Sequence, residues 1–264
     1  MGNVIHNTKL YISFLSTSLK EIFIYRLDCI VGIISQLVTQ LVEIIFIWIT
    51  FQNTDNLAGW NFQQILLLYG VTLISIGILD FCFDSLYDIG PKYIKQGEFD
   101  KILLRPVHPL LSIIGESKAF TAIAYFGLGL FITIKMLIEL AIPITFILIL
   151  KIVFFSIVGA LILGAIQTIL SITSFWTYKS NEIIWTFIRM HSFAKYPIDI
   201  YNGFIKFLIK FILPFVFVAY YPTMDYLGMG NHLMYLSPII AIVLWVIAIK
   251  VWDLALKKYR STGN

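Results

Sequence analysis

Six long apolar stretches, separated by short polar segments, dominate the chain. They lie at about 29–51, 62–83, 120–137, 145–175, 204–221 and 233–251. A helix of about 20 mostly apolar residues is long enough to cross the roughly 30 Å hydrocarbon core of a bilayer. The pattern therefore predicts an all-α polytopic membrane protein, with a six-helix transmembrane domain over residues 29–264.

The segment before the first stretch, residues 1–28, has a different pattern. Its apolar residues recur at helical spacing and its polar residues take the opposite face, as Phe14 and Leu19 do against Ser13 and Lys20. This pattern favours an amphipathic helix that lies in the membrane interface. A cleavable signal peptide is the alternative, but the apolar run that follows is too long and lacks a small-residue cleavage site.

Composition agrees with a membrane location. Hydrophobic residues make up 59% of the chain and charged residues only 13%, whereas soluble domains carry roughly 25% charged residues. Because a water-facing surface cannot be built from so few charges, much of the exterior must face lipid. The two cysteines, Cys29 and Cys82, have neither a metal-ligand spacing nor the pattern of a disulfide framework.

The basic residues predict the orientation of the spans. Seventeen of the 19 Lys and Arg residues fall toward one side of the membrane. They precede the first span, lie between spans two and three, lie between spans four and five or just inside span five, or lie at the end of span six and beyond it. Only Lys135 and Lys151 fall toward the other side. Since short cytoplasmic loops hold the positive charge in membrane proteins, both termini are expected in the cytoplasm. The net charge of +4 then reflects topology and lipid headgroups, and no nucleic-acid partner is expected.

The polar segment 84–109 is predicted to hold two short helices. Pro91 suits the first turn of a helix and Gly97 suits its end, which predicts a helix over 91–96. A second helix is predicted over 98–104, with three apolar residues on one side and two prolines that stop it: Phe99, Ile102, Leu103, Pro106 and Pro109. A compact, charged and amphipathic element of this kind is one that a partner protein could grip.

A polar stripe runs along the first span. Gln36, Gln40 and Glu43 are spaced i, i+4 and i+7 and share one helical face. An ionisable group near the middle of a membrane costs about 3 kcal/mol, so this face should not meet lipid. The stripe either lines a conduit or makes hydrogen bonds between helices, with a protonated Glu43.

The fourth span carries two further sets of residues on which helix packing depends. The polar residues Gln167, Ser171 and Ser174 share one face and are more typical of interhelical hydrogen bonds than of cargo contacts. The small residues Gly159, Ala160 and Gly164 permit close helix approach, either within the chain or across a dimer seam.

The sequence gives no sign of catalysis. It has no Gly-x-x-x-x-Gly-Lys-Ser/Thr phosphate loop, no His-Glu-x-x-His pair and no Gly-x-Ser-x-Gly elbow. We therefore expect no enzyme activity, cofactor or metal in this chain. If ATP drives the protein, a different chain must hydrolyse it.

Two segments resemble the type-2 ABC exporter permeases. The segment from Gly97 to Pro109, GEFDKILLRPVHP, is similar to the motif Gly-Glu-x-Asp-x-x-Leu-x-Arg-Pro that follows the second span in that family. A second similarity is spread over Tyr196–Tyr201, Ile212–Val216 and Tyr220–Pro222. Length, span number and the N-terminal helix also match, so the resemblance covers the whole chain. His108 departs from the small polar residue that is common at its position.

The resemblance implies a membrane subunit that works with a second permease, identical or paralogous, and two cytoplasmic ABC ATPase subunits. It also implies a bacterial plasma membrane and contact with its lipids. The loop would dock on the ATPase, with apolar residues in a groove and Asp100 and Arg105 contacting the ATPase or each other. The coupling residues would be Gly97, Phe99, Asp100, Ile102, Leu103, Arg105 and Pro106.

Two other functions fit the residues less well. A stand-alone secondary transporter or channel would favour inverted repeats and broken helices, and residues 29–137 and 145–251 show no repeat. A membrane-anchored assembly or immunity factor without transport is the other alternative. The resemblance does not indicate the cargo.

Overall fold

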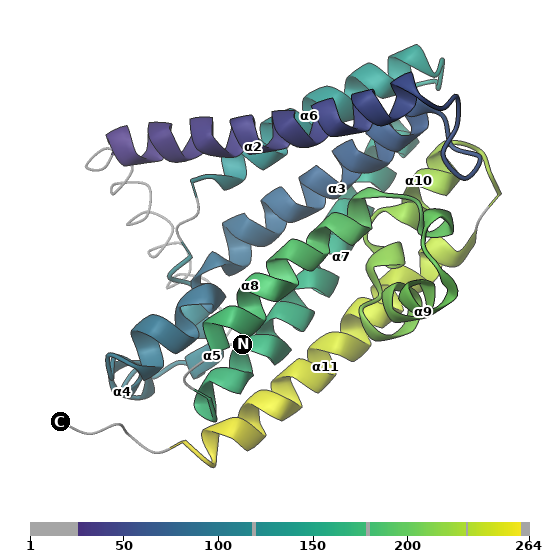
Figure 1. Ribbon diagram of the computed structural model, residues 1–264. Helices are drawn as coiled ribbons and strands as arrows, with labels where there is room; N and C mark the ends of the chain where they lie inside the picture. The colour runs from purple at the N-terminus through teal and green to yellow at the C-terminus, as the bar shows by residue number, and fades with distance from the viewer. Residues whose placement is uncertain (1–25, 118–119, 178–179, 231, 260–264) are drawn as a thin grey trace.

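The computed structural model describes residues 26–117, 120–177, 180–230 and 232–259 (Figure 1). The predicted interfacial helix over 1–28 therefore lies outside the described residues, except for its last three positions. The described part is a bundle of helices without a strand, which confirms the all-α fold.

Among the described residues, five segments are long and apolar enough to cross a membrane, or six if a bent pair of helices counts as one span. The five match the predicted spans one to four and six, although several extend beyond the predicted bounds. These five are α2 (Arg26–Gln52), α3 (Phe62–Phe83) continued by η1 (Asp84–Asp88) and η2 (Ile89–Ile94), α6 (Ala122–Glu139), α7 (Phe146–Ser171) continued by η3 (Ile172–Phe175), and η8 (His232–Leu236) continued by α11 (Ser237–Leu256).

Helix α3 lies at the centre of the bundle. Most of its side chains are buried on every face, as expected for a helix that is apolar all round. Two glycines let α6 approach closely, because a Cβ atom on Gly70 would lie 2.7 Å from Thr133 Oγ1 and one on Gly77 would lie 2.9 Å from the Phe126 nitrogen. The helix begins with a capping box between Asn61 and Gln64.

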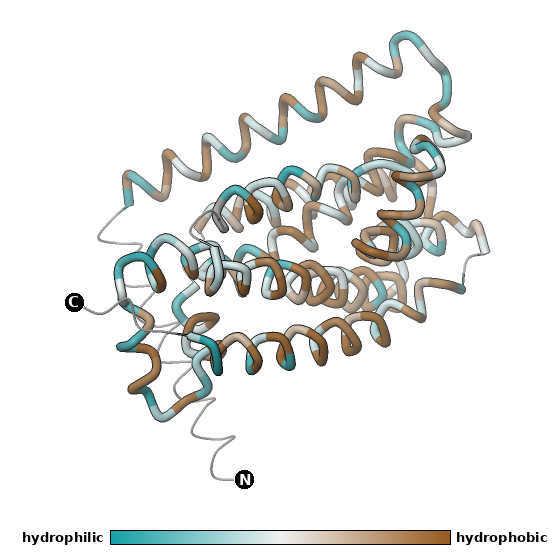
Figure 2. The backbone as a smooth tube through the Cα atoms, turned by 60° about the horizontal axis from the view of Figure 1, so that its bottom comes forward, coloured by the Kyte–Doolittle hydropathy of each residue, from teal (hydrophilic) through white to brown (hydrophobic). Residues whose placement is uncertain are grey.

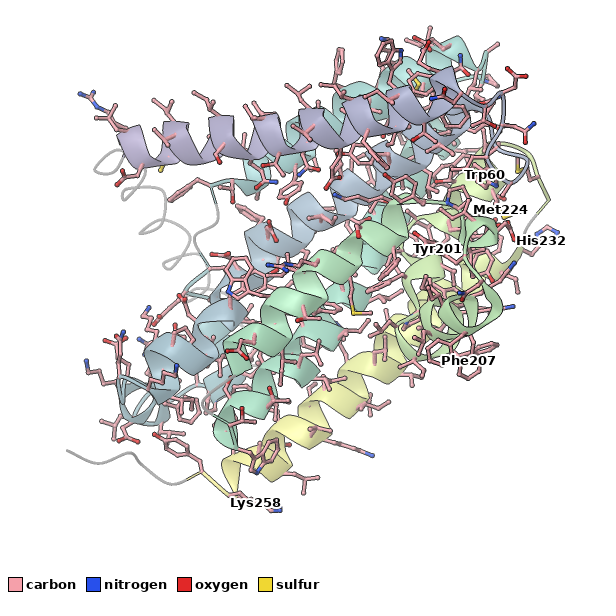
Figure 3. All side chains as sticks on the ribbon, viewed as in Figure 1. Trp60, Tyr201, Phe207, Met224, His232 and Lys258 are labelled. Atoms are coloured by element: carbon pink, nitrogen blue, oxygen red, sulfur yellow. The ribbon has the colours of Figure 1, made fainter. Side chains whose placement is uncertain are left out.

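The bundle has two ends, which we name for the helices that they carry. The α4 end holds α4 (Phe99–Leu103) and α5 (Pro109–Ile114), and hydrophilic residues gather there (Figure 2). The α10 end holds α10 (Tyr220–Tyr226) and also the loop that follows α2. Figure 3 shows Trp60, Met224 and His232 together at the α10 end and Lys258 at the opposite end.

The predicted fifth span, 204–221, is not one straight helix. Its first arm is α9 (Gly203–Phe207) with η6 (Leu208–Ile212), and its second arm is η7 (Phe215–Phe217) with α10. The arms are bent by 65° at the break between Ile212 and Phe215, where Pro214 lacks the N–H that a continuous helix would use.

Contacts show that the two arms enter and leave at the same end. Asp199, just before the first arm, accepts hydrogen bonds from Lys206 Nζ at 2.7 Å and from Tyr220 OH at 2.6 Å. The Tyr220 ring also lies 5.5 Å from that of Trp60, in the loop after α2. We therefore describe residues 203–226 as a re-entrant pair at the α10 end.

A less apolar segment crosses most of the bundle instead. Helix α8 (Ser180–Met190) lies against α7 and begins beside η2 and η3, near the α4 end. It continues through η4 (His191–Lys195), where the Ala194 carbonyl accepts a hydrogen bond from Thr72 in α3 at 3.1 Å. Lys195 and Lys206 therefore do not lie at the α4 end, contrary to the sequence-based grouping of the basic residues.

Candidate coupling loop and intramembrane charge network

The loop at the α4 end folds close to the prediction. The expected helix 98–104 is present as α4, and the expected helix 91–96 appears as η2, two residues earlier and continuous with the second span. Gly97 separates them with a φ of +72°, a left-handed conformation that glycine adopts without strain. Pro109 occupies the first turn of α5.

An aromatic cluster anchors α4 to the transmembrane helices. The Phe99 ring centroid lies 5.2 Å from that of Phe175 at the end of α7, and 6.3 Å and 4.8 Å from those of Trp252 and Tyr259. The Tyr259 hydroxyl also donates a hydrogen bond to Asp100 at 3.1 Å. Helix α4 is thus attached to the ends of both α7 and α11.

This anchoring corrects the expected role of two side chains. Phe99 is fully buried and Ile102 is 2% exposed, so neither side chain can fill a groove on another protein. Their apolar surface completes the core of this chain. The side chains that α4 offers outward are Leu103 and the following Leu104, which are 44% and 86% exposed.

A carboxylate that the sequence-based analysis did not single out holds Arg105. The Arg105 guanidinium lies 2.6 Å from Glu116 Oε1, and Tyr93 OH donates to Glu116 Oε2 at 2.6 Å. Burial raises the pKa of Glu116, but the hydrogen bonds from Tyr93 and Arg105 and the charges of Arg105 and Lys92 outweigh it and hold the pKa below its ordinary value. The ion pair joins the segment between α4 and α5 to the segment that follows α5.

The polar stripe of α2 belongs to a network inside the bundle. Lys195 Nζ lies 2.5 Å from Glu43 Oε2 and 3.4 Å from Gln40 Oε1. The Tyr69 hydroxyl lies 2.8 Å from Gln40 Oε1 and 3.2 Å from Glu43 Oε2. Four side chains from α2, α3 and η4 therefore share one buried polar cluster, which we call the charge network.

The charge network matches the interhelical alternative for the stripe, with Lys195 as the partner of Glu43. Gln36 is not part of it and makes no side-chain hydrogen bond within the described residues. A conduit role for Gln36, Gln40 and Glu43 stays a prediction. Lys195 lies in a polar segment between two predicted spans, where hydropathy alone gives no sign of a buried side chain. The helical spacing of Ile184, Phe187 and His191 before it is the one signal for a helix there.

The polar and small residues of α7 serve packing within the chain. Gln167 and Ser171 donate hydrogen bonds to the Phe83 and Leu86 carbonyls, at 3.3 Å and 3.0 Å. These carbonyls lie where α3 changes to a 3₁₀ turn, which interrupts the regular hydrogen-bond ladder. A Cβ atom on Gly159 would lie 2.8 Å from the Val218 carbonyl, so this glycine lets the re-entrant pair approach α7.

Comparison with known proteins adds one result. A family model described as "ABC-2 family transporter protein" matches residues 37–263, which covers all the transmembrane segments except the start of α2. No curated protein and no solved structure matches the chain at a significant level.

Proposed function

The chain belongs to the ABC-2 family of transporter proteins, and from this premise we propose that it is the permease subunit of an ATP-driven exporter. Two permease subunits would form the conduit, and separate cytoplasmic ATPase subunits would bind and hydrolyse ATP. Beside the family, the observation that carries the proposal is the loop at the α4 end. The contacts of Phe99 and Arg105 hold this loop to the helix ends, and Leu103 and Leu104 are exposed on it. The two leucines are adjacent, and contiguous apolar surface rimmed by polar residues is typical of a contact with a protein or a membrane.

The anchoring of α4 suggests how ATPase movement reaches the membrane. Phe99 connects α4 to the ends of α7 and α11 through an aromatic cluster, and the Arg105–Glu116 pair connects the loop to the segment before α6. A push on Leu103 and Leu104 would therefore move several helix ends together. In this proposal Phe99, Ile102, Asp100 and Arg105 support the loop, and the leucines make the contact.

Copurification tests the proposed docking. The permease with a Leu104→Asp substitution should lose the ATPase during purification in mild detergent, because a charge would be buried in an apolar interface. Leu104→Met is the matched control and should retain the ATPase. Both variants should insert normally, since Leu104 is 86% exposed. Full ATPase retention by Leu104→Asp would refute docking through this residue.

Thiol labelling tests the proposed orientation, with the α4 end in the cytoplasm of a bacterial cell. In a chain whose Cys29 and Cys82 are replaced by alanine, a membrane-impermeant reagent should label Asp55→Cys in intact cells. Lys95→Cys and Lys258→Cys should be labelled only after the membrane is opened. The reverse pattern would place the α4 end outside and exclude docking on a cytoplasmic ATPase.

A stand-alone secondary transporter is the second candidate. The break in the re-entrant pair and the Glu43–Lys195 ion pair are features of that class, which builds its sites from broken helices and intramembrane charges. Transport by the purified chain in vesicles with an imposed ion gradient and no ATPase would favour this candidate. An absolute requirement for ATPase and ATP would exclude it.

A further inference from the structure

A groove between α8, α7 and the re-entrant pair has a charged end and an apolar end. Its volume is about 340 Å³, within the range of small-molecule sites. Along α8 it extends from Glu182 to Met190, about 12 Å at 1.5 Å per residue. Leu170 of α7 and Leu213, at the break of the re-entrant pair, complete it.

The two ends of the groove differ in chemistry. Glu182 lies in the first turn of α8, exposed, and makes no ion pair within the described residues. Thr186 lies one turn further, and its hydroxyl is already used in a 2.7 Å bond to the Glu182 carbonyl. Met190 and Leu213 supply only apolar surface at the far end. A carboxylate without a counterion among the described residues thus lies beside an apolar hollow.

The position of α8 makes a lipid-facing groove unfavourable. Because α8 runs along α7 among the membrane-spanning helices, charges on its exposed face would be costly in contact with lipid tails. Glu182 and Arg189 both lie on that face. A helix N-terminus stabilises a nearby carboxylate, which helps to explain why Glu182 is tolerated but not what fills the hollow beside it.

We propose that this groove binds an amphiphilic cation, with the positive group at Glu182 and the apolar part between Met190 and Leu213. The match rests on one carboxylate at the start of an elongated hollow whose other lining side chains, apart from Thr186, are apolar. Binding of the cation does not depend on the proposed exporter function. Only the idea that the bound cation is transported rests on that function. Arg189 lies outside the groove lining and provides a comparison on the same helix face.

Binding of tetraphenylphosphonium, a lipophilic cation, to the purified chain in lipid nanodiscs tests the proposal. Binding should be saturable above lipid partition. Glu182→Gln should weaken it about tenfold, since a charge-assisted contact contributes about 1.4 kcal/mol or more. Thr186→Trp, which fills the groove from an exposed position, should abolish it. Arg189→Gln and Ser192→Trp are the matched controls and should bind as the wild type does.

Three outcomes would overturn the proposal. These are partition into lipid without saturation, unchanged affinity in Glu182→Gln, and equal displacement by an uncharged aromatic analogue. Disulfide cross-linking of Thr186→Cys between two copies, without cation binding, would show that the groove is a subunit interface. Because no ATPase is present in this assay, its failure is distinct from failure of the docking experiment.

Discussion

The charge network makes a quantitative prediction about stability. Lys195→Met removes the cation that neutralises Glu43, and the side chains of this pair are 7% and 33% exposed, respectively. Breaking a buried ion pair from one side costs about 3–5 kcal/mol. Because a third of Glu43 is exposed and screened, we expect a loss of about 2–3 kcal/mol in the free energy of unfolding.

The double variant Lys195→Met/Glu43→Gln separates this explanation from simple loss of packing. Removing both charges leaves no uncompensated ion, so most of the lost stability should return. Lys135→Met is the control, because its pair with Glu139 is 57% and 41% exposed and should contribute less than about 0.5 kcal/mol.

Unfolding in mixed micelles with increasing SDS, followed by tryptophan fluorescence, measures these differences. The midpoint should fall for Lys195→Met and recover in the double variant. Glu43→Gln alone should also be destabilised, since Lys195 would keep its charge without a carboxylate. A wild-type midpoint for Lys195→Met, or additive losses in the double variant, would refute the ion-pair explanation.

Three further predictions concern packing, the re-entrant pair and pH. Gly77→Val should lower the free energy of unfolding, measured in the SDS titration, by about 1–3 kcal/mol, because its Cβ atom would lie against the α6 backbone; an unchanged free energy would contradict the close approach. Asp225→Asn should speed hydrogen exchange in α10, since Lys151 Nζ lies 2.7 Å from Asp225 Oδ2; unchanged exchange would show that the pair does not fasten α10. The lowered pKa of Glu116 means that its pair with Arg105 stabilises the loop above about pH 4.3 and is lost as the pH falls through the lowered value. Protection of the α4 amides, measured as exchange relative to the intrinsic rate at each pH, should therefore fall in acid, and Arg105→Ala should remove that pH dependence.

The pattern of apolar residues was sufficient to predict the spans that cross the bundle without a break. Their length and apolarity leave few alternatives, because a backbone in lipid must satisfy its own hydrogen bonds as a helix. The same reasoning placed a helix at 98–104, since Gly97 and Pro106 bound it on both sides. These features depend on local sequence and on the solvent, both of which are visible without coordinates.

The predicted fifth span shows the limit of this reasoning. Residues 204–221 are apolar enough for a span, whereas α8 and η4 contain Glu182, Arg189 and Lys195 and look like a polar loop. Hydropathy counts the cost of each charge as if it stood alone. In the structure the Lys195 ammonium meets Glu43 at 2.5 Å, so its cost is reduced by a partner 152 positions away in the sequence.

The loop at the α4 end shows the same division between sequence and tertiary structure. The sequence determined that this protein is a helical membrane protein with a short amphipathic loop after its second span, and its motifs indicated the ABC-2 transporter family. It could not determine which apolar side chains of the loop face inward, because that depends on where the tertiary structure brings Phe175 and Trp252 against Phe99. Only the tertiary structure decided that Phe99 is buried and Leu104 exposed, since burial is set by neighbours brought together from distant parts of the chain.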